Sequence, residues 1–267
     1  MNARFAAALL ALALAGAAAG FWYSRQDSTG GFEPAGHVAD GDWLEHMHSQ
    51  NPKAAEEAAR QVERLGAEAL PEIRAALQDP TADVATKKAA LKATGLLGPT
   101  AAPAVEEVAG LLPDPEFTEE AAVALSYIGR DAYAPLRLAT TSEDPVVRRE
   151  ALRSLGKMRG RAPLDPRAVM PLLLKGLSDP DPGVRSVAAT YLGIIGENGA
   201  SVVPALIETL KDEDPEVRAA AATALGSFEG QAETAMAALK TAIGDRDENV
   251  AREAGLSIVK LQSSARK

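Results

Sequence analysis

Histidines are the residues of this chain whose type and spacing come nearest to a metal site. His46 and His48 stand two positions apart within the segment Asp40–His48, Glu45 is the nearest further ligand, and the third histidine is His37. Side chains at positions i and i+2 of a helix do not share a face, so this pair is poorly placed to hold one ion. We therefore predict no metal site and assign both histidines to a solvated helix.

Carboxylate pairs are the next candidates for chemistry, because two carboxyl groups whose pKa values differ can act as acid and base. Such a difference requires burial, whereas the pairs of this chain lie at the edges of repeated segments. These pairs are Glu106-Glu107, Glu119-Glu120 and Asp212-Glu213-Asp214. The chain has no cysteine, which excludes a cysteine nucleophile. It shows no phosphate-binding, dinucleotide, serine-elbow or zinc-protease motif. We predict no catalytic residue, no cofactor and no enzyme activity.

Basic side chains gather in one stretch of the chain. They are Arg148, Arg149, Arg153, Lys157, Arg159, Arg161 and Arg167. Two interpretations stay open: a solvated face, or a docking patch for an acidic partner or a membrane headgroup, with Arg159 and Arg161 as the residues to test. The whole chain has 28 Lys+Arg against 37 Asp+Glu, a net charge of −9. Because an acidic chain repels a phosphate backbone, we predict no nucleic-acid binding.

A repeated segment must position these side chains. Asp-Pro steps, with Asp-Glu in the last copy, recur at Asp79, Asp114, Asp144, Asp181, Asp214 and Asp247. A proline near the start of an apolar run moves with the first mark, at Pro71, Pro103, Pro135, Pro171 and Pro204. Two marks that drift together at this period indicate a repeat architecture.

Each copy predicts a helical hairpin. An aspartate before proline favours a helix start, because its carboxylate accepts a bond from a free backbone N–H group and proline has no such group to waste. The helix after Asp214 carries apolar residues on one face: Val217, Ala221, Leu225 and Phe228. We expect Gly193 and Gly196 to end the preceding helix and to let the chain turn. The second helix is expected to begin near Pro204.

The pattern resembles the HEAT-repeat family, in particular the short bacterial type related to phycobilisome-lyase HEAT-like repeats. The resemblance rests on Asp-Pro-x-Val-Arg, then Ala, then Leu-Gly, then Pro, and it is best at Asp144–Gly156, Asp181–Gly193 and Asp214–Gly226. It covers residues from about 50 to 262. The expected fold is all-α: an α-solenoid, a superhelix of about six HEAT-like helical hairpins, preceded by an N-terminal apolar segment.

The resemblance also implies roles for particular residues. In that family the arginine after valine bonds to an aspartate of a neighbouring unit. The implied structural ladder consists of Arg148, Arg185 and Arg218 with Asp144, Asp181 and Asp214 as partners. The second helix of each hairpin is expected to line the inner surface, where a partner would lie. The possible partner-facing residues there are Arg74, Glu106, Arg137, Lys175, Glu208 and Lys240, whose mixed signs favour a protein over a polyanion.

The N-terminal residues 1–23 predict a targeting segment. Phe5–Tyr23 carries no charge and is long enough to cross about 30 Å of hydrocarbon. Two interpretations stay open. A signal anchor would place Phe21-Trp22-Tyr23 at the membrane interface, and a signal peptide would be cut before Gly20. Both imply export, either anchored through residues 5–23 and facing the periplasm or the extracellular side, or secreted.

Two further segments complete the expected organisation. Residues 24–41 are rich in Gly, Ser and charge, which favours a flexible tether. Residues 42–267 are expected to form the repeat domain. A capping helix at residues 42–49 would lay Trp43, Leu44 and Met47 over the first hairpin, because terminal repeats need a cover.

Together these features favour a non-enzymatic scaffold that binds another protein, exported and tethered at a membrane. Two alternatives stay open. One is a subunit of an enzyme, such as a phycobilin-lyase-like chromophore-attachment factor, which the repeat type suggests. The other is a passive structural spacer. The export segment and the absence of cysteine from the sequence disfavour the enzyme subunit.

Overall fold

The computed structural model of the chain describes residues 43–158 and 166–264. The predicted targeting segment, the tether and the candidate residues Arg159 and Arg161 lie outside the described residues. Among the helices that are described, none is long and apolar enough to cross a membrane. This part of the chain consists of α-helices and short 3-10 helices, without a strand.

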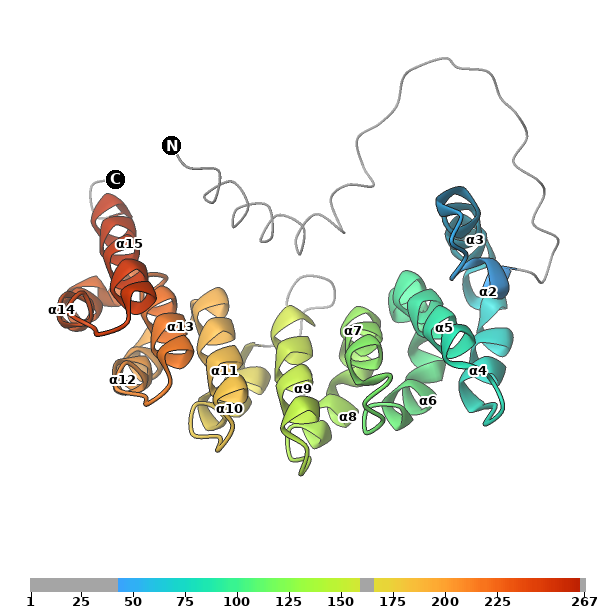
Figure 1. Cartoon of the computed structure of the whole chain (residues 1–267), viewed down its shortest axis with the longest axis horizontal. Coiled ribbons are helices and arrows are strands. Elements are labelled where there is room, and N and C mark those ends of the chain that lie inside the picture. The colour runs from blue at the N-terminus through green and yellow to red at the C-terminus, as the bar shows by residue number, and fades with distance from the viewer. Residues whose placement is uncertain (1–42, 159–165, 265–267) are drawn as a thin grey trace, which may run out of the picture. The chain divides into compact units, whose positions relative to one another are not determined.

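The helices alternate between two layers (Figure 1). The inner layer contains α3 (Pro52–Leu65), α5 (Val84–Leu97), α7 (Thr118–Ile128), α9 (Pro145–Lys157), α11 (Pro182–Ile195), α13 (Pro215–Leu225) and α15 (Glu248–Ser264). The outer layer contains α4 (Leu70–Gln78), α6 (Val105–Gly110), α8 (Tyr133–Ala139), α10 (Pro166–Gly176), α12 (Gly199–Thr209) and α14 (Ala232–Ala242). The 3-10 helices that lead into outer helices are η1 (Gly66–Ala69), η2 (Gly98–Ala104), η3 (Arg130–Ala132) and η5 (Glu229–Gln231).

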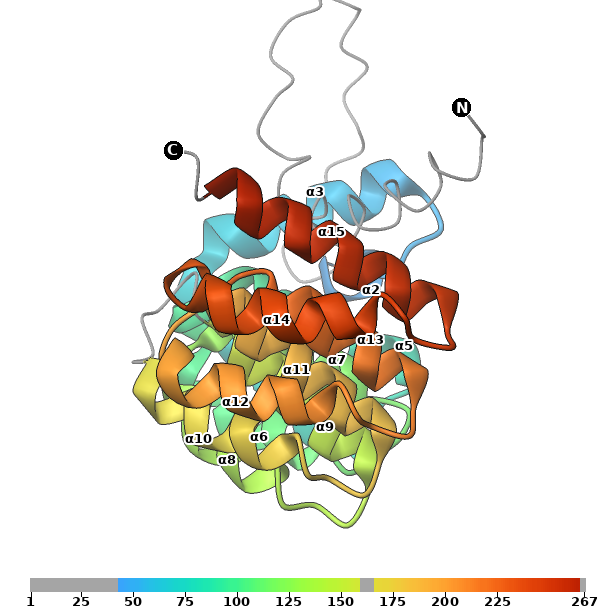
Figure 2. The same cartoon turned by 90° about the vertical axis from the view of Figure 1, so that its left-hand side faces the viewer.

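Each inner helix packs along the next inner helix and on helices of the outer layer. Seen from the end formed by α14 and α15, the helices lie one behind another (Figure 2). The described residues therefore form the all-α repeat solenoid that the sequence predicts.

The inner helices begin in a shared way, which gives their residues a common register. At the starts of α3, α5, α9, α11 and α13 the side chain of the capping residue accepts a hydrogen bond from a backbone N–H group of the helix. These capping residues are Asn51, Asp83, Asp144, Asp181 and Asp214. Asp247 accepts the same kind of bond at the start of α15, as does Asp114 just before α7. The structure differs from the prediction at Asp79. This residue follows α4, and the residue that caps α5 is Asp83, four positions later. We count repeat positions from these seven capping residues.

Alanine at repeat position 7 explains how closely the inner helices pack. All seven inner helices have alanine there, and all seven are fully buried: Ala58, Ala90, Ala121, Ala151, Ala188, Ala221 and Ala254. A methyl side chain brings neighbouring helix backbones close while it keeps a high helix propensity. The alanine-rich composition thus belongs to the contacts between inner helices.

Gly193 serves this close packing and does not end its helix. It lies inside α11, and a Cβ atom built on it would meet the Cα atom of Ala224 in α13 at 2.5 Å. Gly226 likewise faces Ser257 of α15, where a built Cβ would meet the hydroxyl oxygen at 2.7 Å. Gly196 does end α11, with a positive φ of 63°. The expectation that both Gly193 and Gly196 end the helix is therefore wrong for Gly193.

The layer with the smaller residues lies on the concave side of this stack (Figure 1). Consecutive inner helices approach one another more closely than consecutive outer helices do, and a stack whose two layers differ in spacing curves toward the closer one. The helices that begin at the Asp-Pro steps are thus the inner ones. The expectation that the second helix of each hairpin lines the inner surface is wrong, because the sequence pattern does not show which layer packs more tightly.

A short helix covers the N-terminal end of the array. This helix, α2 (Trp43–His46), contacts α3 and α5. Trp43 and Met47 are buried there, and Leu44 is half-buried. The apolar side chains that the sequence singles out in this segment thus close the first inner helices off from solvent.

Candidate functional site

Paired charges join successive units along the turns that lead into the inner helices. Nε and Nη2 of Arg185 each donate to one carboxylate oxygen of Asp212, both at 2.8 Å. Its Nη1 donates to the carbonyl oxygens of Asp179 and Pro180. The same arrangement joins Arg148 to Asp179 and Arg218 to Asp245. Each arginine therefore ties the turn of its own unit to the turn of the next unit.

The arginines form the expected ladder, but their partners are not the expected ones. The partners stand two residues before Asp181, Asp214 and Asp247. The expected partners Asp144, Asp181 and Asp214 instead accept backbone N–H bonds as helix caps. An aspartate at the cap has its carboxylate occupied by its own helix, so the free carboxylate is the one before it. The recurring Asp-x-Asp spelling at 179, 212 and 245 is the signal that could have found this.

The ladder carboxylates are held in their charged form. Hydrogen bonds from Arg218 lower the pKa of Asp245 below its usual value, against the opposing effect of burial. At Asp212, burial acts to raise the pKa, but the bonds from Arg185 and from the backbone of Asp214 outweigh it, and the pKa is lowered. The pKa of each ladder arginine is raised by its aspartate. Each rung thus favours the ionised pair.

Toward the N-terminus other groups replace the ladder. Thr118 stands at the arginine position of α7, and its hydroxyl donates to the carbonyl oxygens of Leu112 and Asp114, both at 2.9 Å. Lys87 stands at the same position of α5, and its ammonium lies 5.8 Å from the centre of the Phe117 ring, a cation–π contact. A hydroxyl keeps the turn of its own unit closed but is too short to reach the next one.

One face of each inner helix points away from the outer layer. Repeat positions 5, 9 and 13 lie one turn apart on that face, opposite the buried positions 7, 11 and 14. At positions 9 and 13 every charged residue is basic: Arg60, Arg64, Lys92, Arg153, Lys157 and Lys260. The other residues there are apolar, hydroxyl-bearing or aromatic: Leu96, Val123, Tyr127, Thr190, Ile194, Thr223, Ser227 and Leu256. We call these two rows the basic rows.

Most carboxylates of the inner helices lie nearer the starts of the helices, and Glu63 near the end of α3 is an exception. At positions 5 and 6 they are Glu56, Glu57, Glu119, Glu120, Glu150 and Glu253. Both signs therefore occur beside the turns, where position 5 also carries Lys88, Arg149 and Arg252, whereas only basic charges occur farther along the helices at positions 9 and 13. The sequence reasoning missed this division, because it assigned the surface to the other helices. Counting residues from each capping residue would have found it.

Helix α9 holds the densest part of the basic rows. The side chain of Glu150 is only 7% exposed, and it accepts from Nε of Arg149 at 3.2 Å and lies 3.4 Å from Nε of Arg153. Among the described residues, these contacts leave the terminal Nη groups of both arginines unengaged. Lys157 follows one turn after Arg153 and is exposed. A buried carboxylate thus orients two guanidinium groups whose side chains are partly exposed, at 36% and 37%.

The next two inner helices present no charge over the same face. The exposed and half-buried positions of α11 and α13 carry Ser186, Val187, Thr190, Ile194, Ala220, Thr223 and Ser227. The side chain of Tyr191 packs against Gly156 of α9, and burial raises the pKa of its phenol. The inner surface is thus basic over α9 and uncharged over α11 and α13.

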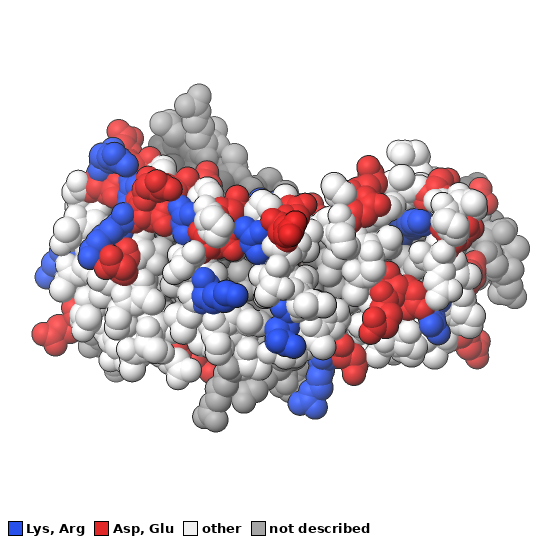
Figure 3. All heavy atoms as spheres, turned by 90° about the horizontal axis from the view of Figure 1, so that it is seen from below, with Lys and Arg blue, Asp and Glu red and all other residues white. Residues whose placement is uncertain are grey.

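The predicted partner-facing residues lie elsewhere. Arg74, Arg137, Lys175, Glu208 and Lys240 all belong to outer helices and are exposed there. Glu208 pairs with Lys211 at 2.7 Å. The outer face is mostly uncharged, and charged side chains of both signs gather along one of its edges (Figure 3). Glu106, the sixth predicted residue, is exposed on the outer helix α6, and the six residues are spread over six different outer helices.

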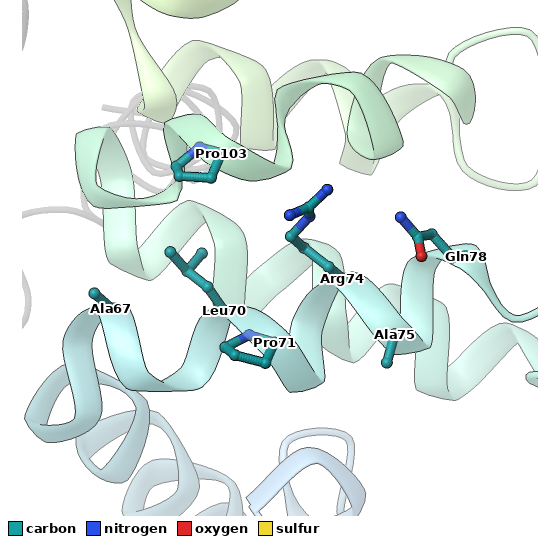
Figure 4. Close-up of a pocket in the computed structure, with 7 residues that line it drawn as sticks. All are labelled: Ala67, Leu70, Pro71, Arg74, Ala75, Gln78 and Pro103. Carbon is teal, nitrogen blue, oxygen red and sulfur yellow. The ribbon is translucent and has the colours of Figure 1, made fainter.

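Arg74 lines an open pocket of about 450 Å³ between α4 and η2. Leu70, Arg74 and Gln78 project from α4 to the same side, and Pro103 faces Leu70 (Figure 4). Arg74 and Gln78 both donate to one carboxylate oxygen of Glu107, while the other oxygen is buried with no partner within the described part of the chain. The guanidinium of Arg74 is therefore already bound by its own protein. Among the described residues, no group of three potential ligands is placed to hold a metal ion.

Comparison with known proteins agrees with this architecture. Residues 133–202 and 170–258 match the family described as HEAT repeats. The first match begins at the first residue of α8, an outer helix, so each family unit runs from an outer to an inner helix. The chain has no significant sequence match among curated proteins.

Solved structures show the same fold. The structure of Kap121p covers 80% of this chain with a TM-score of 0.62 and 14% identity. The structure of Kap121p bound to Nup53p also covers 80% of this chain, with a TM-score of 0.60 and 16% identity. In both cases the chain spans 28% of the length of Kap121p. A designed armadillo repeat protein covers 72% of this chain over 99% of its own length, with a TM-score of 0.50 and 19% identity. Residues 133–258 thus match the HEAT-repeat family, and the described residues share the α-solenoid fold of these solved structures.

Proposed function

We propose that this protein is a non-enzymatic scaffold that binds another protein along the inner surface of α5 to α15. The observation that carries the proposal is the register of the inner helices, which sets positions 9 and 13, exposed or half-buried in every unit, in continuous rows across successive units. A surface of this kind fits an extended or helical segment of a partner, because each unit adds the same contact at a regular step.

Two further observations support the proposal. Kap121p, whose fold this chain shares, is seen bound to a second protein, Nup53p. Within this chain, the outer face offers the open pocket at Arg74, whose guanidinium is already engaged by Glu107. The inner face presents guanidinium edges, hydroxyl groups and exposed apolar side chains such as Ile194, which is 58% exposed.

Site-specific cross-linking in cells tests the proposed surface. A photoreactive amino acid at Thr190 or Thr223 should capture a discrete partner, because both side chains are exposed on the inner face. The same amino acid at Lys175 of the outer layer is the matched control and should capture much less. Equal capture from both layers, or none from the inner layer with a folded protein, would contradict the proposal.

We also propose that the protein is exported and tethered through residues 5–23. The support is the uncharged apolar stretch of that segment and the basic residue that precedes it. Membrane fractionation together with N-terminal sequencing of the mature protein tests this. An intact N-terminus in the membrane fraction supports the anchor, a start at Gly20 in the exported soluble fraction supports cleavage, and an intact cytosolic protein contradicts export.

A further inference from the structure

We infer that the partner segment held by the inner surface is acidic and extended, and that it runs along the basic rows from α5 to α15. The inference rests on the proposed function and adds the chemistry of the partner. A chain with a net charge of −9 nonetheless presents only basic charges at positions 9 and 13 of its inner helices. This separation of charge favours a negatively charged partner along those rows.

The carboxylates near the rows from α5 to α15 are mostly paired already, and one of them reaches a row: Glu253 pairs with Arg252 at 3.2 Å and accepts from the hydroxyl of Thr223. Glu120 is paired with Lys88 at 3.0 Å, and Glu150 is shared by Arg149 and Arg153. At positions 9 and 13 the neighbours of α9 are Val123 and Tyr127 on α7, and Thr190 and Ile194 on α11. Glu119 stands at position 5 of α7, beside Arg149. The positive charge is therefore least opposed at Lys157, which has no ion pair among the described residues, whereas Arg153 is partly opposed by Glu150.

The arginines of α9 have the geometry that a carboxylate partner requires. Glu150 engages Nε of each guanidinium, which leaves the edge formed by the two Nη groups of Arg153 available within the described part of the chain. This edge donates two parallel N–H bonds and matches the two oxygens of a carboxylate. Because Glu150 is almost completely buried, it fixes both guanidinium groups before a partner arrives, which reduces the entropy lost on binding.

The rows at α3 are weaker candidates, because their charges are satisfied within the helix. Arg60 pairs with Glu56 at 2.6 Å, and Arg64 pairs with Glu57 at 2.8 Å. We therefore place the segment from Lys92 on α5 to Lys260 on α15. Five helix-to-helix steps of about 9–10 Å give roughly 45–50 Å, which about 14–15 residues span in an extended conformation.

Between its acidic residues the segment should carry small or apolar side chains. Helices α11 and α13 present hydroxyl and alkyl groups there, and α15 adds Leu256 and Val259, which are 58% and 63% exposed. An acidic residue over these helices would lose its hydration without gaining an ion pair. The pattern expected of the partner is thus acidic residues over α5 and α9, and neutral ones over α11 and α13.

The test uses the full chain and a fluorescein-labelled peptide of sixteen residues in which Glu alternates with Ser over one half, to match α5 to α9, and Ser alternates with Ala over the other half. Fluorescence polarisation should show saturable binding that weakens as salt is raised. The neutral peptide with Gln in place of Glu should not bind. A six-residue version should bind at least about tenfold more weakly, because it contacts fewer of the inner helices.

Two triple variants with the same change of net charge separate this surface from general attraction. Lys92→Gln, Arg153→Gln and Lys157→Gln together should weaken binding by about tenfold, since each exposed ion pair contributes a few-fold. Arg137→Gln, Lys175→Gln and Lys240→Gln on the outer layer should leave binding within about twofold. Equal effects of the two triple variants would overturn the inference. A double variant, Lys92→Gln with Lys157→Gln, repeats the test without disturbing Glu150.

Other anionic occupants are outcomes of the same experiment. Tighter binding of a sixteen-nucleotide single-stranded oligothymidine than of the Glu peptide, with the same loss in the inner variant, would assign the rows to nucleic acid and overturn the inference. Binding of phosphatidylglycerol vesicles in place of the peptide, with that same loss, would also overturn it. If the peptide fails while cross-linking from Thr190 still captures a partner, the acidic specificity is wrong and the proposed scaffold function stands.

Discussion

Arg185 and Asp212 are joined by two parallel hydrogen bonds although 27 residues separate them in the chain. Both side chains are largely buried, at 10% and 12% exposure. Two residues further on, Asp214 accepts only backbone N–H bonds at the start of its own helix. The two aspartates are near neighbours with different tasks, one between units and one within a unit.

Replacing each aspartate by asparagine separates these tasks. Asn caps a helix about as well as Asp, so Asp214→Asn should change the free energy of unfolding by no more than about 0.5 kcal/mol. Asp212→Asn leaves Arg185 as an uncompensated, largely buried charge and should cost about 3 kcal/mol. Urea unfolding at pH 7 followed by circular dichroism measures both values. Equal losses of unfolding free energy in the two variants would show that the ion pair between units stabilises the fold no more than the helix cap does.

The ladder should make stability depend on pH in a defined window. The pKa values of Asp179, Asp212 and Asp245 are lowered from 3.8 in the folded state. A lowered folded pKa stabilises the protein above the unfolded value and loses this contribution as pH falls through the folded one. Unfolding free energy should therefore hold steady above about pH 5 and fall below pH 3.8. The Asp212→Asn variant should show a shallower fall in the same urea titration.

Two glycines in inner helices should respond to alanine in opposite directions. At Gly193 a Cβ atom would meet the backbone of Ala224 at 2.5 Å, so Gly193→Ala should destabilise the protein by about 1–3 kcal/mol. At Gly255, inside α15, a Cβ atom would meet nothing within 4 Å. Gly255→Ala should stabilise by about 0.5–1 kcal/mol. Thermal unfolding compares them, and a stable Gly193→Ala variant would contradict the close approach of α11 and α13.

Removing a side chain of the helix that covers the N-terminal end should destabilise only the neighbouring helices. Trp43 is only 1% exposed, and Trp43→Ala removes a buried side chain worth about 3–5 kcal/mol. Because repeats contact only their neighbours, the loss should stay near α3 and α5. Hydrogen exchange should quicken in α3 and remain unchanged in α13. Uniform quickening over both helices would mean that the array opens as a single unit.

The fold was largely predictable from the sequence, because its signals are local. Asp181-Pro and Asp214-Pro begin helices as predicted, and the apolar residues spaced after each of them lie in the core. Boundaries were less predictable where the pattern is loose. At Asp79 the carboxylate bonds to Thr81 in the turn, and a later aspartate, Asp83, begins the helix. A cap signal alone does not distinguish these two uses of the same side chain.

The site was less predictable, because it depends on which layer packs more closely. Sequence reasoning noted Arg153 and Lys157 as part of a basic cluster but placed the partner on the other helices. The deciding contacts, such as Gly193 against Ala224, are between residues of adjacent units. Periodicity shows that a helix has an apolar face, but it does not show how near the next helix lies. The inner surface therefore required the tertiary structure.

The ladder is unevenly distributed, and this has a mechanical consequence. Charged rungs join the units from Arg148 onward, whereas Thr118 and Lys87 stand at the corresponding positions before it. Bidentate ion pairs resist sliding and separation of adjacent turns more than a hydroxyl or a ring contact does. Under tension between its two ends the array should behave as a spring with a compliant N-terminal half and a stiff C-terminal half. A load would extend α3 to α7 first and leave the spacing of α9 to α15 intact.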